Sequence, residues 1–150
     1  MKRASAGDLE PLLHPKSIAI VGASETGLYP SGILRNLLRF GYNGKIFPVN
    51  PRHEAIMGLK SYAKIIDIKE DVDLAVIVIP RGFTLDIMRQ CKMKDVKAVT
   101  IISSGFGEAD EYGKQLEKDL VKFAKESGIT ICGPNCAGLA NLYDDVILTA

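Results

Sequence analysis

Residues 18–27 of this 150-residue chain have the sequence IAIVGASETG, an unbroken apolar run followed by a turn with a glycine at each end. Because the run does not alternate with polar residues, it predicts a strand that is buried on both faces of a parallel sheet. Four similar runs follow along the chain, at residues 46–49, 74–79, 98–102 and 129–132. Their starts lie about 24 to 31 residues apart, the length of one strand plus one crossover helix.

Amphipathic segments fill the gaps between these runs. Apolar residues recur at helical spacing over three stretches, residues 33–38, 83–91 and 112–123. Gly41 follows the first stretch where a left-handed C-cap would fall. Residues 59–62 predict a short edge strand and residues 65–70 a single helical turn. Pro48 removes one ladder donor, so the second strand is expected to be short or to lack a neighbour on one side. We therefore predict a single-domain α/β fold with a doubly wound, mostly parallel sheet in the order 3-2-1-4-5-6.

The composition excludes several classes of protein. Lysine and arginine number 19 against 18 acidic residues, a net charge of +1 that gives no strong field for nucleic acid or a membrane surface. The longest apolar run, residues 74–80, is too short to cross a bilayer, and no apolar stretch follows Lys2 and Arg3 as in a secretory signal. Three cysteines, an odd count, argue against a disulfide framework. The sequence thus predicts a soluble cytoplasmic protein.

The chain divides into a lead-in and one domain. Residues 1–14 are expected to precede the domain, which spans residues 15–150. Residues 146–149 predict the beginning of another strand just before Ala150. We therefore expect the domain to continue into a further domain or to pair with a separate subunit.

Ligands of doubly wound sheets bind beyond the carboxyl ends of the strands, so the loops there are the candidate site. Residues 22–27 form the first loop, where glycine permits close backbone approach and a helix N-terminus offers free amides. Ser24 stands where the dinucleotide fingerprint has its second glycine, and Leu28 and Tyr29 stand where a Walker loop needs Lys and Ser or Thr. The loop predicts a phosphate site for no particular nucleotide; a plain strand-to-helix turn is the alternative.

The second loop discriminates between nucleotides. An NAD site has Asp or Glu at the end of the second strand, to bind the ribose hydroxyls. This chain has Asn50, Pro51, Arg52 and His53 there instead. Because a cation suits a phosphate attached to the ribose, the loop favours NADP or coenzyme A over NAD.

Three further loops reach the same edge of the sheet, at residues 79–82, 102–108 and 133–138. Arg81 is expected either to contact phosphate or to be an ordinary solvated residue. Residues 102–108 are rich in hydroxyls and glycines, which favours contact with a ligand. Cys132 and Cys136 have a CxxxC spacing without a second pair, so no metal site is predicted. Cys136 also lacks an evident base that would make it a nucleophile, and we predict no catalytic residue.

Five segments together carry a family resemblance: PKSIAIVGAS (15–24), VNPR (49–52), DLAVIVIP (73–80), SSGFGE (103–108) and GPNCAG (133–138). In this order they resemble the CoA-binding N-terminal domain of ADP-forming (NDP-forming) acyl-CoA synthetases, relatives of the succinyl-CoA synthetase α subunit. The resemblance covers nearly the whole chain from about residue 12 and implies a Rossmann-like fold that binds coenzyme A. The residues implied to contact coenzyme A are Gly22, Ala23, Ser24, Asn50, Pro51, Arg52, His53, Ile79, Pro80, Ser103, Ser104, Gly105, Asn135 and Cys136.

The resemblance also implies a role for each loop. The first would hold phosphates, Arg52 with His53 would neutralise the 3′-phosphate, and residues 79–80 would line the adenine and pantetheine path. Ser103 and Ser104 would bind the pantetheine or phosphate region, and residues 135–136 would stand near the thiol.

The enzymes resembled convert acid, coenzyme A and ATP reversibly into acyl-CoA, ADP and phosphate through a phosphohistidine. That histidine lies in a flavodoxin-like ligase domain and the nucleotide in an ATP-grasp domain, and neither domain has a counterpart in these residues. His14 and His53 are poorly placed for such a relay. We therefore expect the chain to bind coenzyme A, to catalyse nothing alone, and to have those domains or subunits as partners. The alternatives are a stand-alone sensor of CoA or acyl-CoA and an NADP-binding oxidoreductase domain.

Overall fold

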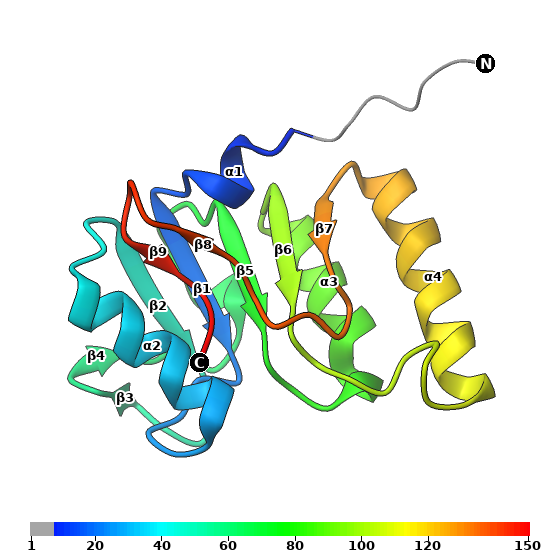
Figure 1. The fold of residues 1–150 in the computed structure, drawn as a ribbon, viewed down its shortest axis with the longest axis horizontal. Helices are drawn as coiled ribbons and strands as arrows, with labels where there is room; N and C mark the ends of the chain where they lie inside the picture. The colour runs from blue at the N-terminus through cyan, green and yellow to red at the C-terminus, as the bar shows by residue number, and fades with distance from the viewer. Residues whose placement is uncertain (1–7) are drawn as a thin grey trace.

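The structure, a computed structural model that describes residues 8–150, is built on a five-stranded parallel sheet with helices on both faces (Figure 1). The strands are hydrogen-bonded in the order β2-β1-β5-β6-β7, and every neighbouring pair is parallel. Their bounds are β1 Ser17–Val21, β2 Lys45–Val49, β5 Leu74–Ile77, β6 Ala98–Ile101 and β7 Thr130–Cys132. The predicted α/β fold is confirmed, and all five apolar runs form the expected strands.

The third position of the predicted order is reduced to a single parallel bridge between Val49 and Tyr62. Residues 59–62 do not form one strand: β4 (Leu59–Lys60) pairs antiparallel with β3 (Ala55–Ile56) instead. Pro48 has no amide to extend the ladder backwards, as the sequence suggested. Beyond the bridge, the Lys64 amide donates to the carboxylate of Asp67, 3.0 Å away, and the chain turns into the 3₁₀ helix η1 (Ile65–Asp67).

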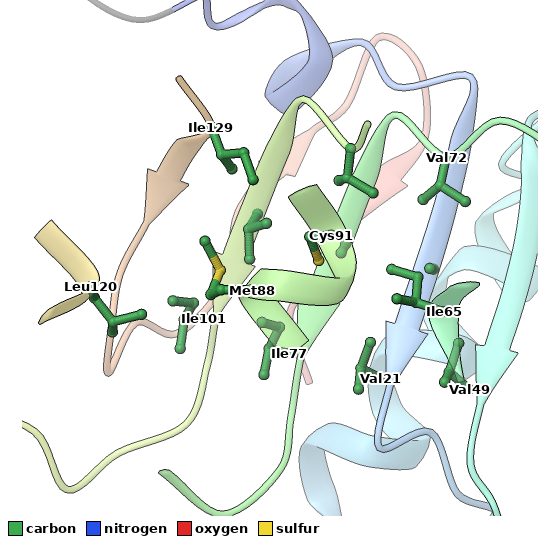
Figure 2. Packing of buried hydrophobic residues seen from close by; sticks show 14 of the residues in the cluster. Val21, Val49, Ile65, Val72, Ile77, Met88, Cys91, Ile101, Leu120 and Ile129 are labelled. Carbon is green, nitrogen blue, oxygen red and sulfur yellow. The ribbon is translucent and has the colours of Figure 1, made fainter. Parts of the chain in front are cut away.

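The three central strands β1, β5 and β6 bury both of their faces. Ala19 and Val21 of β1 lie in one apolar cluster, whereas Ile18 and Ile20 lie in the other. The first cluster, shown in Figure 2, packs against α3 (Thr84–Met93) and α4 (Glu111–Ser127). The second packs against α2 (Leu28–Phe40) and the C-terminal segment. This double burial explains why the strands are continuously apolar.

The helices follow the predicted stretches with one difference. Gly41 caps α2 in the left-handed conformation, as expected. Phe83, however, is not part of the third helix's buried stripe, which consists of Thr84, Met88 and Cys91. It belongs to the short 3₁₀ helix η2 (Arg81–Phe83) before α3 and is 61% exposed. The apolar stretch predicted over residues 83–91 thus spans two different elements.

The hairpin near the C-terminus meets the N-terminal segment at the amino ends of the strands. The predicted strand at residues 146–149 is β9 (Val146–Ile147), which pairs antiparallel with β8 (Ala140–Asn141). The Asn141 side-chain amide donates to the Leu13 carbonyl, 2.8 Å away, at the end of α1 (Glu10–Leu13). Of the predicted lead-in, residues 1–7 lie outside the described residues. Within residues 8–150, no helix has the length and apolar character needed to span a bilayer.

Candidate functional site

Two cavities open along the carboxyl edge of the sheet. The β2 cavity, about 480 Å³, lies against the ends of β1 and β2 and the start of α3. The β6 cavity, about 660 Å³, lies against the loops after β6 and β7 and the first turn of α2. Val78, Ile79 and Pro80, which follow β5, line both cavities. The two cavities therefore form one crevice divided by this shared wall.

Most of the predicted contact residues line this crevice. In the β2 cavity these are Gly22, Asn50, Pro51 and Arg52, in the β6 cavity Ser103, Ser104, Asn135 and Cys136, and in both Ile79 and Pro80. The other predicted residues, Ala23, Ser24, His53 and Gly105, line neither cavity. Ala23 is completely buried in the second apolar cluster, which packs against α2, whereas His53 is exposed beyond Arg52.

Gly22 brings the first loop into contact with the shared wall. Its φ is +92°, and a Cβ on it would lie 2.3 Å from the carbonyl oxygen of Val78. Its amide donates to the Val49 carbonyl, 2.9 Å away, so this amide is not available to a phosphate. The amides of Glu25, Gly27, Leu28 and Tyr29 donate to no acceptor among residues 8–150. The free donors therefore lie further along the loop than the glycine turn itself.

Asn50 ties the first loop to the second. Its side-chain amide donates to the Ala23 carbonyl, 2.8 Å away, and its side-chain oxygen accepts from the Arg52 amide, 2.9 Å away. Because both ends of the amide are used in this way, Asn50 positions the loops rather than offering a free group to the cavity.

The basic residues of the two cavities differ in their partners. Arg52 and Lys64 line the β2 cavity, and neither lies within 4.0 Å of a carboxylate oxygen in the described residues. Arg81 lines the β6 cavity and makes a two-pronged pair with Asp110, at 2.7 and 3.1 Å. It also donates to the Gly105 carbonyl and lies 5.1 Å from the centre of the Tyr112 ring. The sequence left open whether Arg81 contacts phosphate or is an ordinary solvated residue. In the structure its guanidinium contacts residues of the protein itself and so has a structural role.

Charge pairing at Arg81 shifts the titration of its partners. The hydrogen bond from Arg81, aided by the Gly113 amide, lowers the pKa of Asp110 below its ordinary value. Amides of its own loop likewise lower the pKa of Glu108, whose carboxylate accepts from the Gly105 amide at 2.6 Å. Much of the donor capacity of the loop after β6 is therefore used internally.

The two serines of that loop have different roles. The Ser103 hydroxyl donates to the Ile79 carbonyl at 2.6 Å and accepts from the Ile79 amide at 3.2 Å. It therefore joins the loop after β6 to the shared wall. Ser104 is exposed and lines the β6 cavity, where its hydroxyl has no partner among the described residues.

The thiol-bearing loop closes the far side of the β6 cavity. The Cys136 thiol donates to the Ile101 carbonyl, 3.3 Å away, and the Asn135 amide donates to the Ser103 carbonyl, 3.0 Å away. Burial, followed by the neighbouring Cys136, raises the pKa of Cys132. In residues 8–150 no three His, Cys, Asp or Glu side chains gather as metal ligands. His14 lies at the other end of the sheet, where a hydrogen bond with Asp144 raises its pKa.

Several residues that line the two cavities are not predicted from the sequence. They are Leu28, Tyr29 and Pro30 in the β6 cavity, and Lys64, Phe83, Ile87 and Gln90 in the β2 cavity. A signal for Lys64 existed, because it follows the predicted edge strand and so reaches the carboxyl edge beside the second loop. No sequence signal indicated Gln90, because a helical pattern does not show which polar residue faces a cavity.

Comparison with known proteins places this crevice in context. Residues 16–141 match the protein-family profile described as "CoA binding domain". The α subunit of the ADP-forming acetate–CoA ligase I of Pyrococcus furiosus is 44% identical over 136 residues, which cover 87% of this chain and 29% of the subunit. The ADP-forming acetate–CoA ligase II of Archaeoglobus fulgidus is 43% identical over 93% of this chain and 21% of its own length.

A solved structure agrees with these relatives. The dinucleotide-forming acetyl-coenzyme A synthetase 1 of Ca. Korarchaeum cryptofilum, in complex with phosphate and ADP, superposes with a TM-score of 0.86 at 40% identity. The superposition covers 92% of this chain and 30% of the synthetase. The chain thus spans between about a fifth and a third of the length of these three proteins.

Proposed function

This chain belongs to the CoA binding domain family, and from that premise we propose that it serves as the coenzyme A site of an ADP-forming acyl-CoA synthetase. The 3′-phosphate and adenosine would occupy the β2 cavity, and the pantetheine and thiol the β6 cavity. The free amides before and within the first turn of α2 would take the diphosphate. The relatives' names support this activity, since they are ADP-forming acetate–CoA ligases.

One observation carries the choice of ligand. Arg52 lines the β2 cavity and has no carboxylate partner in the described residues. No Asp or Glu of these residues lines the cavity. A ribose with free hydroxyls would need an acidic acceptor at this position. A ribose that carries a phosphate needs a cation, and Arg52 supplies one.

The chain's own contribution would be to position the thiol. The shared wall, held by Ser103, and the loop of Asn135 and Cys136 are fixed by internal hydrogen bonds. A preformed cavity holds the thiol at one place, where an acyl phosphate on a neighbouring domain could be attacked. The flavodoxin-like and ATP-grasp parts would act as partners, in the same polypeptide or as a separate subunit. A cytoplasmic location fits the three free cysteines.

Calorimetric titration with three ligands tests this proposal. Coenzyme A is expected to bind most tightly, 3′-dephospho-coenzyme A more weakly and NADPH most weakly. Replacing Arg52 by Ala should narrow the gap between the first two by about 1.5 to 3 kcal/mol, because a charge-assisted contact is lost. Arg39→Ala is the matched control, since Arg39 is exposed on α2 and lies over Phe40. Equal binding of coenzyme A and NADPH, or no binding of coenzyme A, would contradict the proposal.

A further inference from the structure

Lys64 reaches the β2 cavity from a segment separate from the loop of Arg52. The bridge between Val49 and Tyr62 aligns the two segments in parallel, and the Asn50 amide donates to the Tyr62 carbonyl at 2.9 Å. Arg52 lies three residues beyond Val49, and Lys64 lies two residues beyond Tyr62. Both side chains line the same cavity. Two cations of different segments are therefore held at one site by the fold.

The charge of Lys64 is not used within the described structure. The carboxylate of Asp67 accepts from the main-chain amide of Lys64, and its oxygens lie more than 4.0 Å from the ammonium group. Lys60, by contrast, lies over the Tyr62 ring at 4.9 Å. Because no carboxylate lines the cavity, the charges of Arg52 and Lys64 are not neutralised from within it.

A second observation, independent of charge, points to a ligand in this cavity. The Gln90 side-chain oxygen is buried and has no hydrogen-bond donor in residues 8–150. A buried acceptor without a donor is costly, and rotation of the Gln90 side chain toward the cavity that it lines would bring this oxygen within reach of an N–H group of a ligand. Phe83, 61% exposed, adds an aromatic face to the same cavity. An aromatic base with an exocyclic amine satisfies both features.

We infer that Lys64 is a second phosphate-binding residue, which together with Arg52 selects an adenosine that carries a phosphate monoester. This inference rests on the proposed function, because it assigns Lys64 to the 3′-phosphate of coenzyme A. It concerns specificity: Lys64 would contribute to binding of the phosphate and nothing to binding of the rest of the molecule. A monoester dianion matches the summed charge of the two side chains.

The test compares ligands that differ only in that phosphate. Lys64→Gln is expected to weaken coenzyme A binding about tenfold and to leave 3′-dephospho-coenzyme A binding within about twofold. The double variant Arg52→Gln/Lys64→Gln should bind the two ligands almost equally. Lys69→Gln is the matched control, because Lys69 is exposed in the same region and lines neither cavity. Raising the salt concentration should shrink the effect of Lys64→Gln.

The outcomes separate this inference from the proposed function. If wild-type protein binds coenzyme A but Lys64→Gln behaves like Lys69→Gln, Lys64 has no role in phosphate binding and the proposed function stands. An equal loss for both ligands would also overturn the inference, since it would indicate a general effect on the cavity. If the wild type binds neither ligand, the proposed function itself fails. Urea denaturation of each variant shows whether the fold is intact.

Discussion

The two cavities share a wall and an edge of the sheet, yet they use their polar groups in opposite ways. In the β6 cavity, Arg81 is held by Asp110, and the Ser103 hydroxyl joins two loops. In the β2 cavity, Arg52 and Lys64 have no carboxylate partner in the described part of the chain. One half of the crevice is thus fixed by internal contacts, whereas the other keeps its charge for an external group.

This difference indicates which property each half supplies. A cation paired with a carboxylate stabilises the fold, but its field on a ligand is largely cancelled. An unpaired cation contributes nothing to folding and becomes favourable only when an anion arrives. Affinity for phosphate should therefore come from the β2 cavity, and accurate placement of the other end of the ligand from the β6 cavity.

Replacing Gly22 by Ala should have the largest effect, because it disturbs the wall that both cavities share. The added methyl group would lie 2.3 Å from the Val78 carbonyl oxygen, in a left-handed backbone conformation that alanine adopts reluctantly. We expect the free energy of unfolding to fall by about 3 kcal/mol, measured by urea denaturation.

Gly41→Ala is the control for this variant. Gly41 has a similar φ of +81°, but a Cβ there meets nothing within 4 Å. It should cost only about 1 kcal/mol, the strain of the conformation alone. Equal losses for the two glycines would show that the close approach of Gly22 to the wall has no energetic importance.

Replacing Arg81 by Ala should have a smaller effect that sharpens the contrast between the cavities. The variant loses the pair with Asp110, the contact with the Gly105 carbonyl and the packing on Tyr112. Its urea midpoint should therefore be lower than that of Arg89→Ala, whose guanidinium pairs only with exposed Asp86 one turn away. Identical midpoints would mean that Arg81, too, is free to serve a ligand.

The smallest effect should be a pH dependence at Asp110. Because the folded-state pKa of Asp110 lies below its ordinary value of 3.8, the pair with Arg81 stabilises the protein fully at pH values well above 3.8. That stabilisation is lost as the pH falls through the lower folded-state pKa. The difference in urea midpoint between wild type and Asp110→Asn should therefore shrink from about pH 5 to about pH 3. In the Arg81→Ala background the difference should depend less on pH, and an unchanged dependence would contradict this assignment.

The sheet was predicted well from the sequence, because a strand that is buried on two faces requires a continuous apolar run of residues. The runs that became β1, β2, β5, β6 and β7 are continuously apolar except for Thr100 and Thr130, and the short connections between them limited the order of the strands. The edge strand expected at residues 59–62 is limited before the bridge by Pro48, which has no amide to donate, and beyond the bridge by Asp67, which accepts from the Lys64 amide. Its carboxylate is only three residues away, so this competition was visible in principle.

The candidate site was predicted as a set of loops, and the loops do line one crevice. The amino-acid order alone sufficed for this, since parallel strands bring their carboxyl ends to one edge and Arg52 follows a strand. Which groups stay free was settled by contacts between residues distant along the chain. Arg81 meets Asp110, 29 positions later, and Ser103 meets Ile79, 24 positions earlier. A donor forms a hydrogen bond with whichever acceptor folding brings within reach. Which acceptor that is depends on the packing of the whole molecule rather than on any one segment.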